Sequence, residues 1–217
     1  MASSYVNNLR LNELGTGDAS GTWGTITNTN LELIGEALGV GTEAITTNAD
    51  THDSTVTNGT SAGGSDNDGA RAIYLRYTGT LDSTCTITIA PNDIRRLQFI
   101  ENATSGSQNI IISQGSGANV TIAPGTTKAV YLDGGGSTAA VVDAFAHLAV
   151  VDLTVDDALV VTGATTFNGA DVTISAGVDL ITATAGTSNT RIGVNAGDAI
   201  ASGGEKNVFV GDEAGTA

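Results

Sequence analysis

The feature that most constrains this chain is a period of two in hydrophobicity between residues 70 and 143. In "ARAIYLRYTG", Leu75 and Tyr77 alternate with more polar neighbours, and in "CTITIA" Ile87 and Ile89 alternate with threonines. Such alternation is typical of strands with one buried face. Six or seven such pieces follow one another at spacings of about 10 residues, with turn residues between them. The spacing predicts a small antiparallel β-sandwich or barrel-like domain over residues 46–145.

The composition fits a mainly β chain and disfavours several partners. The chain has 217 residues with 29 Gly, and charged residues make up 14% of it, against about 25% in average globular chains. A net charge of −15 repels phosphate backbones and anionic membrane surfaces, so we expect no nucleic-acid partner. The longest apolar stretch, residues 139–161, is interrupted by aspartates and a histidine, so we expect no membrane insertion.

The residues that usually carry chemistry are sparse. One cysteine, Cys85, cannot form a disulfide within the chain, and the two histidines, His52 and His147, lie in different blocks. "SDNDGAR" at 65–71 resembles the start of a calcium loop, but the downstream glutamate of that motif is missing. We therefore expect no catalytic residues, no cofactor site and no metal site, and interpret the chain as not an enzyme.

Residues 1–45 differ from the rest and predict an N-terminal segment with one short helix. In "TNTNLELIGEALGVG", Asn30 or a neighbouring threonine can cap the helix, and Gly39 or Gly41 can end it. A helix this short is not stable alone. Its apolar stripe packs either on the core of its own domain or on a larger assembly. The apolar residues that this segment offers for docking are Tyr5, Leu9, Leu11, Leu14, Trp23, Leu31, Leu33, Ile34 and Leu38.

Residues 146–188 consist of short alternating apolar pieces separated by Gly, Asn and Asp. Each piece has too few apolar residues to bury a core within one chain, but several chains wound together could share one. We therefore predict an intertwined, homotrimeric β shaft. Its predicted core, continued into the end of the chain, consists of Leu153, Val155, Leu159, Val161, Phe167, Val172, Ile174, Ile192 and Val210.

Residues 189–217 contain a repeat. "IGVNAG" at 192–197 is echoed by "VGDEAG" at 210–215, with an offset of 18 (192 to 210). The glycines allow tight turns, and the leading Ile or Val suits a stacked core. Because a stacked array usually needs at least three repeats, we expect further repeats beyond these two.

Four stretches resemble known families of proteins. "SGTWGTITNTNLELIGEALG" and "GTEAITTNADTHDSTV" resemble the N-terminal region of tail fibre proteins from marine bacteriophages of the cyanophage and pelagiphage type. The run from "RAIYLRYTG" to "STAAVVDA" resembles the next section of the same proteins, and the closing repeats resemble the head repeats of trimeric adhesins and fibres.

The resemblance implies a virion structural protein: a homotrimeric tail fibre, synthesised in the host cytoplasm and located in the virion tail. Its N-terminal region would bind adaptor or nozzle proteins of the tail through the docking residues given above. The shaft would carry a distal region, not seen here, that meets the host cell surface. Two alternatives stay open: a tailspike depolymerase whose catalytic region lies outside this chain, and a cellular trimeric adhesin.

Overall fold

The computed structural model describes residues 4–59, 69–150, 153–156, 159, 161, 190–192, 196–197, 200 and 204–215. Contacts divide the chain into a first unit, Met1–Asp152, and a second unit, Leu153–Ala217. The division lies close to residue 146, where the sequence predicts the start of the shaft. The fold is mainly β, with one α-helix among the described residues.

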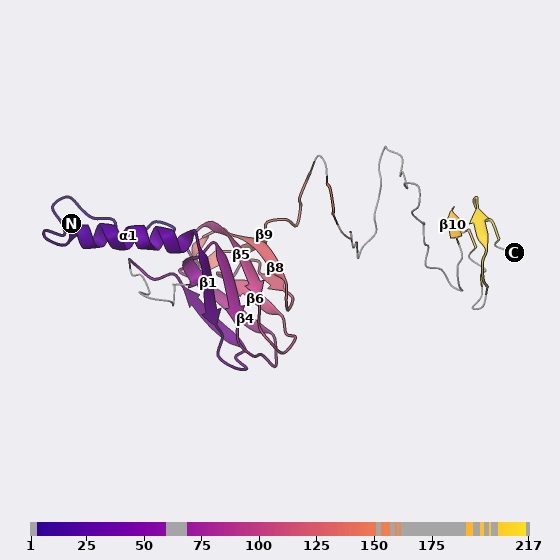
Figure 1. Ribbon diagram of the computed structural model, residues 1–217, viewed down its shortest axis with the longest axis horizontal. Helices are drawn as coiled ribbons and strands as arrows, with labels where there is room; N and C mark the ends of the chain where they lie inside the picture. Colours follow the sequence, from indigo (N-terminus) through magenta and orange to yellow (C-terminus); the bar gives the residue numbers. More distant parts are fainter. Residues whose placement is uncertain are drawn as a thin grey trace. The chain divides into compact units, whose positions relative to one another are not determined.

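The first unit contains helix α1, two short 3-10 helices and two mixed sheets (Figure 1). The elements in chain order are α1 (Trp23–Ala37), β1 (Val40–Ala44), β2 (Thr51–Thr55), η1 (Gly69–Arg71), β3 (Tyr74–Thr78), β4 (Cys85–Ala90), β5 (Arg96–Asn102), β6 (Ile110–Ser113), β7 (Val120–Ile122), β8 (Thr127–Leu132), η2 (Gly136–Thr138) and β9 (Val141–Asp143).

The strand directions correct the antiparallel prediction. The chain passes alternately from one sheet to the other, so that β3 pairs in parallel with both β1 and β5, and β4 pairs in parallel with both β2 and β6. Each pass through both sheets therefore forms one coil stacked on the previous coil, as in a β-solenoid. Only β7, β8 and β9 run antiparallel to the strands they pair with, and they end the stack. The sheet orders are β1-β3-β5-β8-β9 and β2-β4-β6-β7.

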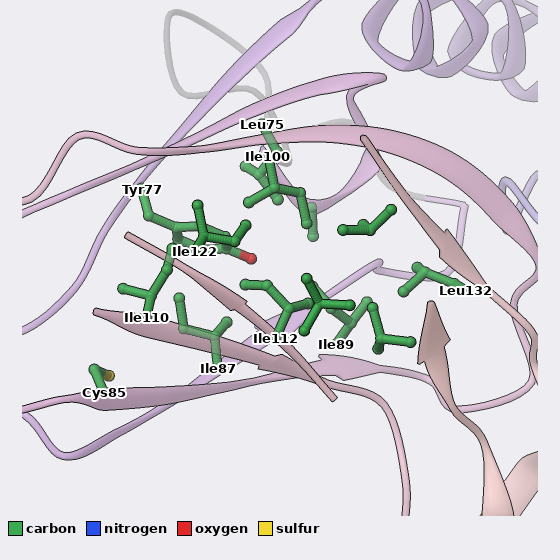
Figure 2. Packing of buried hydrophobic residues seen from close by; sticks show 14 of the residues in the cluster. Leu75, Tyr77, Cys85, Ile87, Ile89, Ile100, Ile110, Ile112, Ile122 and Leu132 are labelled. Atoms are coloured by element: carbon green, nitrogen blue, oxygen red, sulfur yellow. The ribbon is translucent and has the colours of Figure 1, made fainter. Parts of the chain in front are cut away.

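The inward side chains of successive coils lie on top of one another. Leu75 is opposite Ile100, and Ile87 is opposite Ile112, and all four are fully buried. Figure 2 shows these side chains pointing toward each other between the two sheets. The predicted alternation in "CTITIA" is confirmed, since Cys85, like the two isoleucines of that strand, is buried.

Strand β5 departs from the rule that apolar side chains point inward and polar side chains outward. Gln98 and Asn102 are fully buried, whereas Leu97 and Phe99 are exposed. The nitrogens of both buried amides are bonded: Gln98 Nε2 donates to the Ala72 carbonyl oxygen at 2.8 Å, and Asn102 Nδ2 donates to the Ile122 carbonyl oxygen at 3.1 Å. These amides hold turns and neighbouring strands inside the coil, which explains why polar residues occupy inward positions.

Helix α1 begins earlier than the sequence predicts. It starts at Trp23, so Asn30 is an interior residue and not the N-cap, and the helix ends at Ala37, just before the predicted glycine. The stretch "TITNTN" is rich in β-branched and polar residues, which have weak helix propensity and hide the first two turns. Tertiary contacts stabilise them, because the side chain of Asn30 bonds the N-terminal segment.

The second unit contains a two-stranded parallel sheet, formed by β10 (Thr190–Ile192) and β11 (Val208–Val210). Ile192 is opposite Val210, which matches the repeat offset of 18 found in the sequence. The two copies therefore pair in register as neighbouring strands.

The predicted shaft core is described only in part. Phe167, Val172 and Ile174 lie outside the described residues. The others have exposed side chains within a single chain, ranging from 42% exposure at Val155 to 66% at Leu159. No strand is formed by the described residues between β9 and β10.

Candidate interaction surface

The N-terminal segment is folded back on itself. The backbones of Ser4 and Glu13 form an antiparallel bridge, with N–H to carbonyl distances of 3.2 and 2.8 Å. Inside this loop, the Asn7 side chain bonds both backbone groups of Leu11, accepting from its N–H at 2.8 Å and donating to its carbonyl oxygen at 2.9 Å. Asn7 also donates to the Glu13 carboxylate at 2.7 Å. The segment therefore has a defined shape before it meets any partner.

Arg10 attaches this segment to the coil. Its guanidinium donates to the Tyr5 carbonyl oxygen at 2.7 Å and forms an ion pair with Asp93, which precedes β5. Its carbonyl oxygen accepts the Gly59 N–H at 2.7 Å. Arg10 is itself 8% exposed, whereas the Asp93 side chain is 57% exposed, so water screens the carboxylate end of this ion pair.

Arg71 attaches the same segment from the other side. Its buried guanidinium donates to the carbonyl oxygens of Leu9 and Thr57. Its Nε lies 3.7 Å from a carboxylate oxygen of Glu36 on α1. One side chain from η1 thus joins the N-terminal segment, the helix and the loop after β2.

Asn30 also attaches the N-terminal segment to α1, because its side-chain amide bonds backbone groups of that segment as a neighbouring strand would. Its Oδ1 accepts the Asn12 N–H, and its Nδ2 donates to the Asn12 carbonyl oxygen, both at 2.9 Å. The residues 4–14 therefore lie along α1, and both belong to the first unit.

A small apolar groove lies where α1 meets the five-stranded sheet. Its cavity volume is about 180 Å³. Apolar side chains line most of it, together with Arg71 and Arg96. The lining residues are Leu9, Ile34, Ala37, Leu38, Arg71, Ala72, Ile73, Arg96, Leu97 and Gln98.

The structure separates the nine predicted docking residues into three groups. Leu33 is fully buried. Tyr5, Leu9 and Leu11 are half-buried. The exposed group consists of Leu14, Trp23, Leu31, Ile34 and Leu38, of which Trp23, Leu31 and Leu38 are each more than 60% exposed.

Sequence reasoning missed the residues that fix this surface in place. Arg10, Arg71 and Asn30 carry no apolar signal, so a search for amphipathic stripes passes over them. One signal was present: the chain has only 8 Lys and Arg against 23 Asp and Glu. In so acidic a chain, individual cations are candidates for structural roles.

A second polar cluster lies inside the first coil. The Glu43 carboxylate accepts from Ser54 Oγ at 2.5 Å and contacts His52 Nε2 at 3.1 Å. Burial raises the pKa of the Tyr77 hydroxyl beside them well above its ordinary value, and the Glu43 carboxylate raises it further. Ser54 and His52 both bond the carboxylate and not one another, so this geometry does not activate Ser54 as a nucleophile.

No family model, curated protein or solved structure was found to match the chain. Among the described residues, no three His, Cys, Asp or Glu side chains gather where they could hold a metal ion. No helix in the described part of the chain is long and apolar enough to cross a membrane.

Proposed function

We propose that the chain is a virion structural protein, a homotrimeric bacteriophage tail fibre. Its N-terminal region attaches to adaptor or nozzle proteins of the tail. Its later segments form a shaft that presents a distal host-binding region. The class of protein is taken from the sequence resemblance of residues 1–145 to marine phage tail fibres.

The observation that supports assembly most directly is the exposed alternation after residue 152. Leu153, Val155, Leu159 and Val161 are all exposed within one chain, although their spacing is that of a strand with one buried face. Apolar side chains arranged in this way are stabilised when neighbouring chains cover them.

The anchor role is supported by an exposed apolar stripe that runs along α1 and onto its C-cap residue, Leu38. Trp23, Leu31 and Leu38 present large apolar side chains to solvent, on a segment that Arg10, Arg71 and Asn30 hold in a defined shape. Exposed aromatic and aliphatic residues on a rigid support are typical of binding hot spots.

The anchor is tested by adding the fibre to particles that lack it and measuring incorporation. The double variant Trp23→Glu, Leu31→Glu is expected to lower incorporation at least about tenfold, because it places charges in an apolar contact. The double variant Thr25→Glu, Asn28→Glu, which adds the same two charges at exposed positions of α1 outside the apolar stripe, is the matched control. Normal incorporation of the double variant would refute the anchor role.

The shaft is tested by the mass of the full chain in solution. A homotrimer gives three times the mass of one chain, and Leu153→Asp combined with Leu159→Asp is expected to weaken it. A wild-type chain that remains monomeric at micromolar concentrations would contradict the proposal.

A further inference from the structure

The two sheets of the first unit differ in what they present on their outer faces. On the five-stranded sheet, Leu97, Tyr131 and Val142 form one row across β5, β8 and β9, and each is more than 40% exposed. A second row joins Val40, through Tyr74, to Phe99. We call Val40, Leu97, Phe99, Tyr131 and Val142 the apolar sheet face.

The four-stranded sheet is mostly polar at the corresponding positions, where Ile111 on β6 is the large apolar residue and is half-buried. Thr51 is opposite Thr86 across β2 and β4, and Asp53 is opposite Thr88. Thr121 is the exposed position of β7. This is the ordinary outer face of a sheet in contact with water, so the apolar sheet face is specific to one side of the unit.

Charge distinguishes the apolar sheet face as well. At the outward positions of β1, β3, β5, β8 and β9, the described charged residues are Arg76 and Glu101, and their side chains pair at 3.4 Å. The Tyr74 hydroxyl also donates to Glu101, at 3.0 Å. This face is therefore locally neutral, although the chain carries a net charge of −15.

A neutral face on so acidic a chain favours one kind of occupant. Two copies approaching through their acidic surfaces repel each other, whereas the neutral apolar face removes that repulsion where they meet. A basic partner would be attracted to the acidic surfaces and away from this one. Charge thus favours another copy of the same chain.

The area of the apolar sheet face is about half of what one partner buries in a standard protein interface. Five strands about 4.8 Å apart, each about five residues long at about 3.3 Å per residue, cover roughly 400 Å². A standard interface buries about 800 Å² on each partner. The surface continues onto the groove through Leu97 and Ile73 and past β9 onto exposed Phe145 and Leu148, which supplies further area.

We propose that the apolar sheet face is an interface between copies of this chain. The inference rests on the self-association in the proposed function and adds a second contact, independent of the shaft residues after 152. Copies packed through this face cover Leu97, Phe99 and Tyr131, and Arg76 and Glu101 stay paired at the edge of the contact.

The test uses the full chain and two kinds of variant. Leu97→Glu and Tyr131→Glu each place an unpaired charge in the contact and are expected to weaken association about tenfold or more, measured by sedimentation equilibrium. Thr121→Glu, on the outer face of the other sheet, is the matched control and is expected to leave association unchanged. Circular dichroism verifies that each variant is folded.

A cysteine variant provides a second measurement that does not depend on disrupting the contact. Leu97→Cys is expected to give covalent dimers with a short bis-maleimide, whereas Thr121→Cys gives none. The native Cys85 is buried and remains unreactive in both.

The outcomes separate the two proposals. If the wild-type chain associates but neither glutamate variant weakens it and the Leu97→Cys variant does not cross-link, the sheet-face interface is wrong while the shaft proposal stands. If the wild-type chain is monomeric, both fail. If the thiol introduced by Leu97→Cys is unreactive toward a monofunctional maleimide in a monomeric chain, the chain's own residues cover the face, which also overturns the inference.

Discussion

The first unit and the segment that follows it share an alternation of apolar and polar residues. The apolar residues are buried in the first unit and exposed in the segment that follows. In β4, the alternating residues Ile87 and Ile89 are fully buried by the neighbouring coils of the same chain. Past residue 152, Leu153 and Leu159 alternate in the same way, yet each is about two-thirds exposed, at 65% and 66%. Alternation therefore indicates which side chains are expected to be buried, but not whether the same chain or a neighbouring chain buries them.

The largest expected loss of stability follows from a substitution in the core of the coils. Ile112→Ala removes a fully buried side chain and should lower the free energy of unfolding by about 2–5 kcal/mol. Leu153→Ala is the matched variant outside the coils and should change that transition by less than about 0.5 kcal/mol. Chemical denaturation followed by circular dichroism measures both. Equal losses would mean that the segment after 152 packs on the coils.

Close stacking of the coils is tested at the turn between β5 and β6. Gly106 has φ +98°, and a Cβ there would collide with the Leu81 carbonyl oxygen. Gly106→Ala should destabilise the unit by about 3 kcal/mol, combining backbone strain with overpacking. Gly125→Ala, at φ +70° in open space, should lose only about 1 kcal/mol. Similar values for the two, measured by thermal unfolding, would argue against tight stacking at this turn.

The N-terminal segment offers a third comparison, since side-chain hydrogen bonds attach it to α1 and to the coils. Asn30→Ala removes both bonds to Asn12 and should weaken the local attachment by about 1–2 kcal/mol. Alanine also has a higher helix propensity, so α1 itself persists. Hydrogen exchange should show faster exchange of the Asn12 amide, while amides of β4 are unchanged. An unaltered Asn12 amide would show that Arg10 and Arg71 suffice.

The smallest change in stability is expected from a substitution in β9, the last strand before the exposed segment. Bonds from Lys128 and from the Phe145 N–H lower the pKa of Asp143 below its ordinary value. Because the folded-state pKa is depressed, the stabilisation is present above the unfolded pKa of about 3.9 and is lost as pH falls through the folded value. Asp143→Asn should flatten that part of the acid stability profile.

The expected size of this contribution at pH 7 is below about 1 kcal/mol, because Lys128 is 40% exposed and water screens the pair. Unfolding measured at a series of pH values checks it. An unchanged acid profile in the variant would remove Asp143 as a source of the pH dependence.

Much of the coil unit could be read from the sequence, and the failures have definite causes. The strands from β3 to β9 coincide with the predicted apolar pieces, because burial of one face imposes a period of two in any sheet. Parallel pairing could not be read in the same way, since the partner of Leu75 is Ile100 in the next coil. No local signal marks a pairing at that separation. In the terminal repeat a second copy of the motif made such a signal available.

The interaction surface was predictable only in outline. Leu31 and Leu38 were found by helical spacing, but Leu33 on the same helix is buried by packing that the spacing does not reveal. The apolar sheet face was missed because strand β5 buries Gln98 and exposes Phe99, which inverts the rule used to assign faces. The inversion is explained by the carbonyl oxygens that the buried amides bond, one in the turn before β3 and one on β7, and these belong to distant parts of the sequence.

The antiparallel closure of the coils by β7, β8 and β9 also makes the unit extensible. Parallel coils repeat the same register, here an offset of 25 between Leu75 and Ile100, so a copy of residues 71–95 inserted before β5 would find β3 and β4 beneath it and β5 and β6 above it. The stack would lengthen by about 4.8 Å for each added coil, and both ends would keep their contacts. A unit built in this way can serve as a spacer whose length changes by whole coils, without any redesign of what it joins.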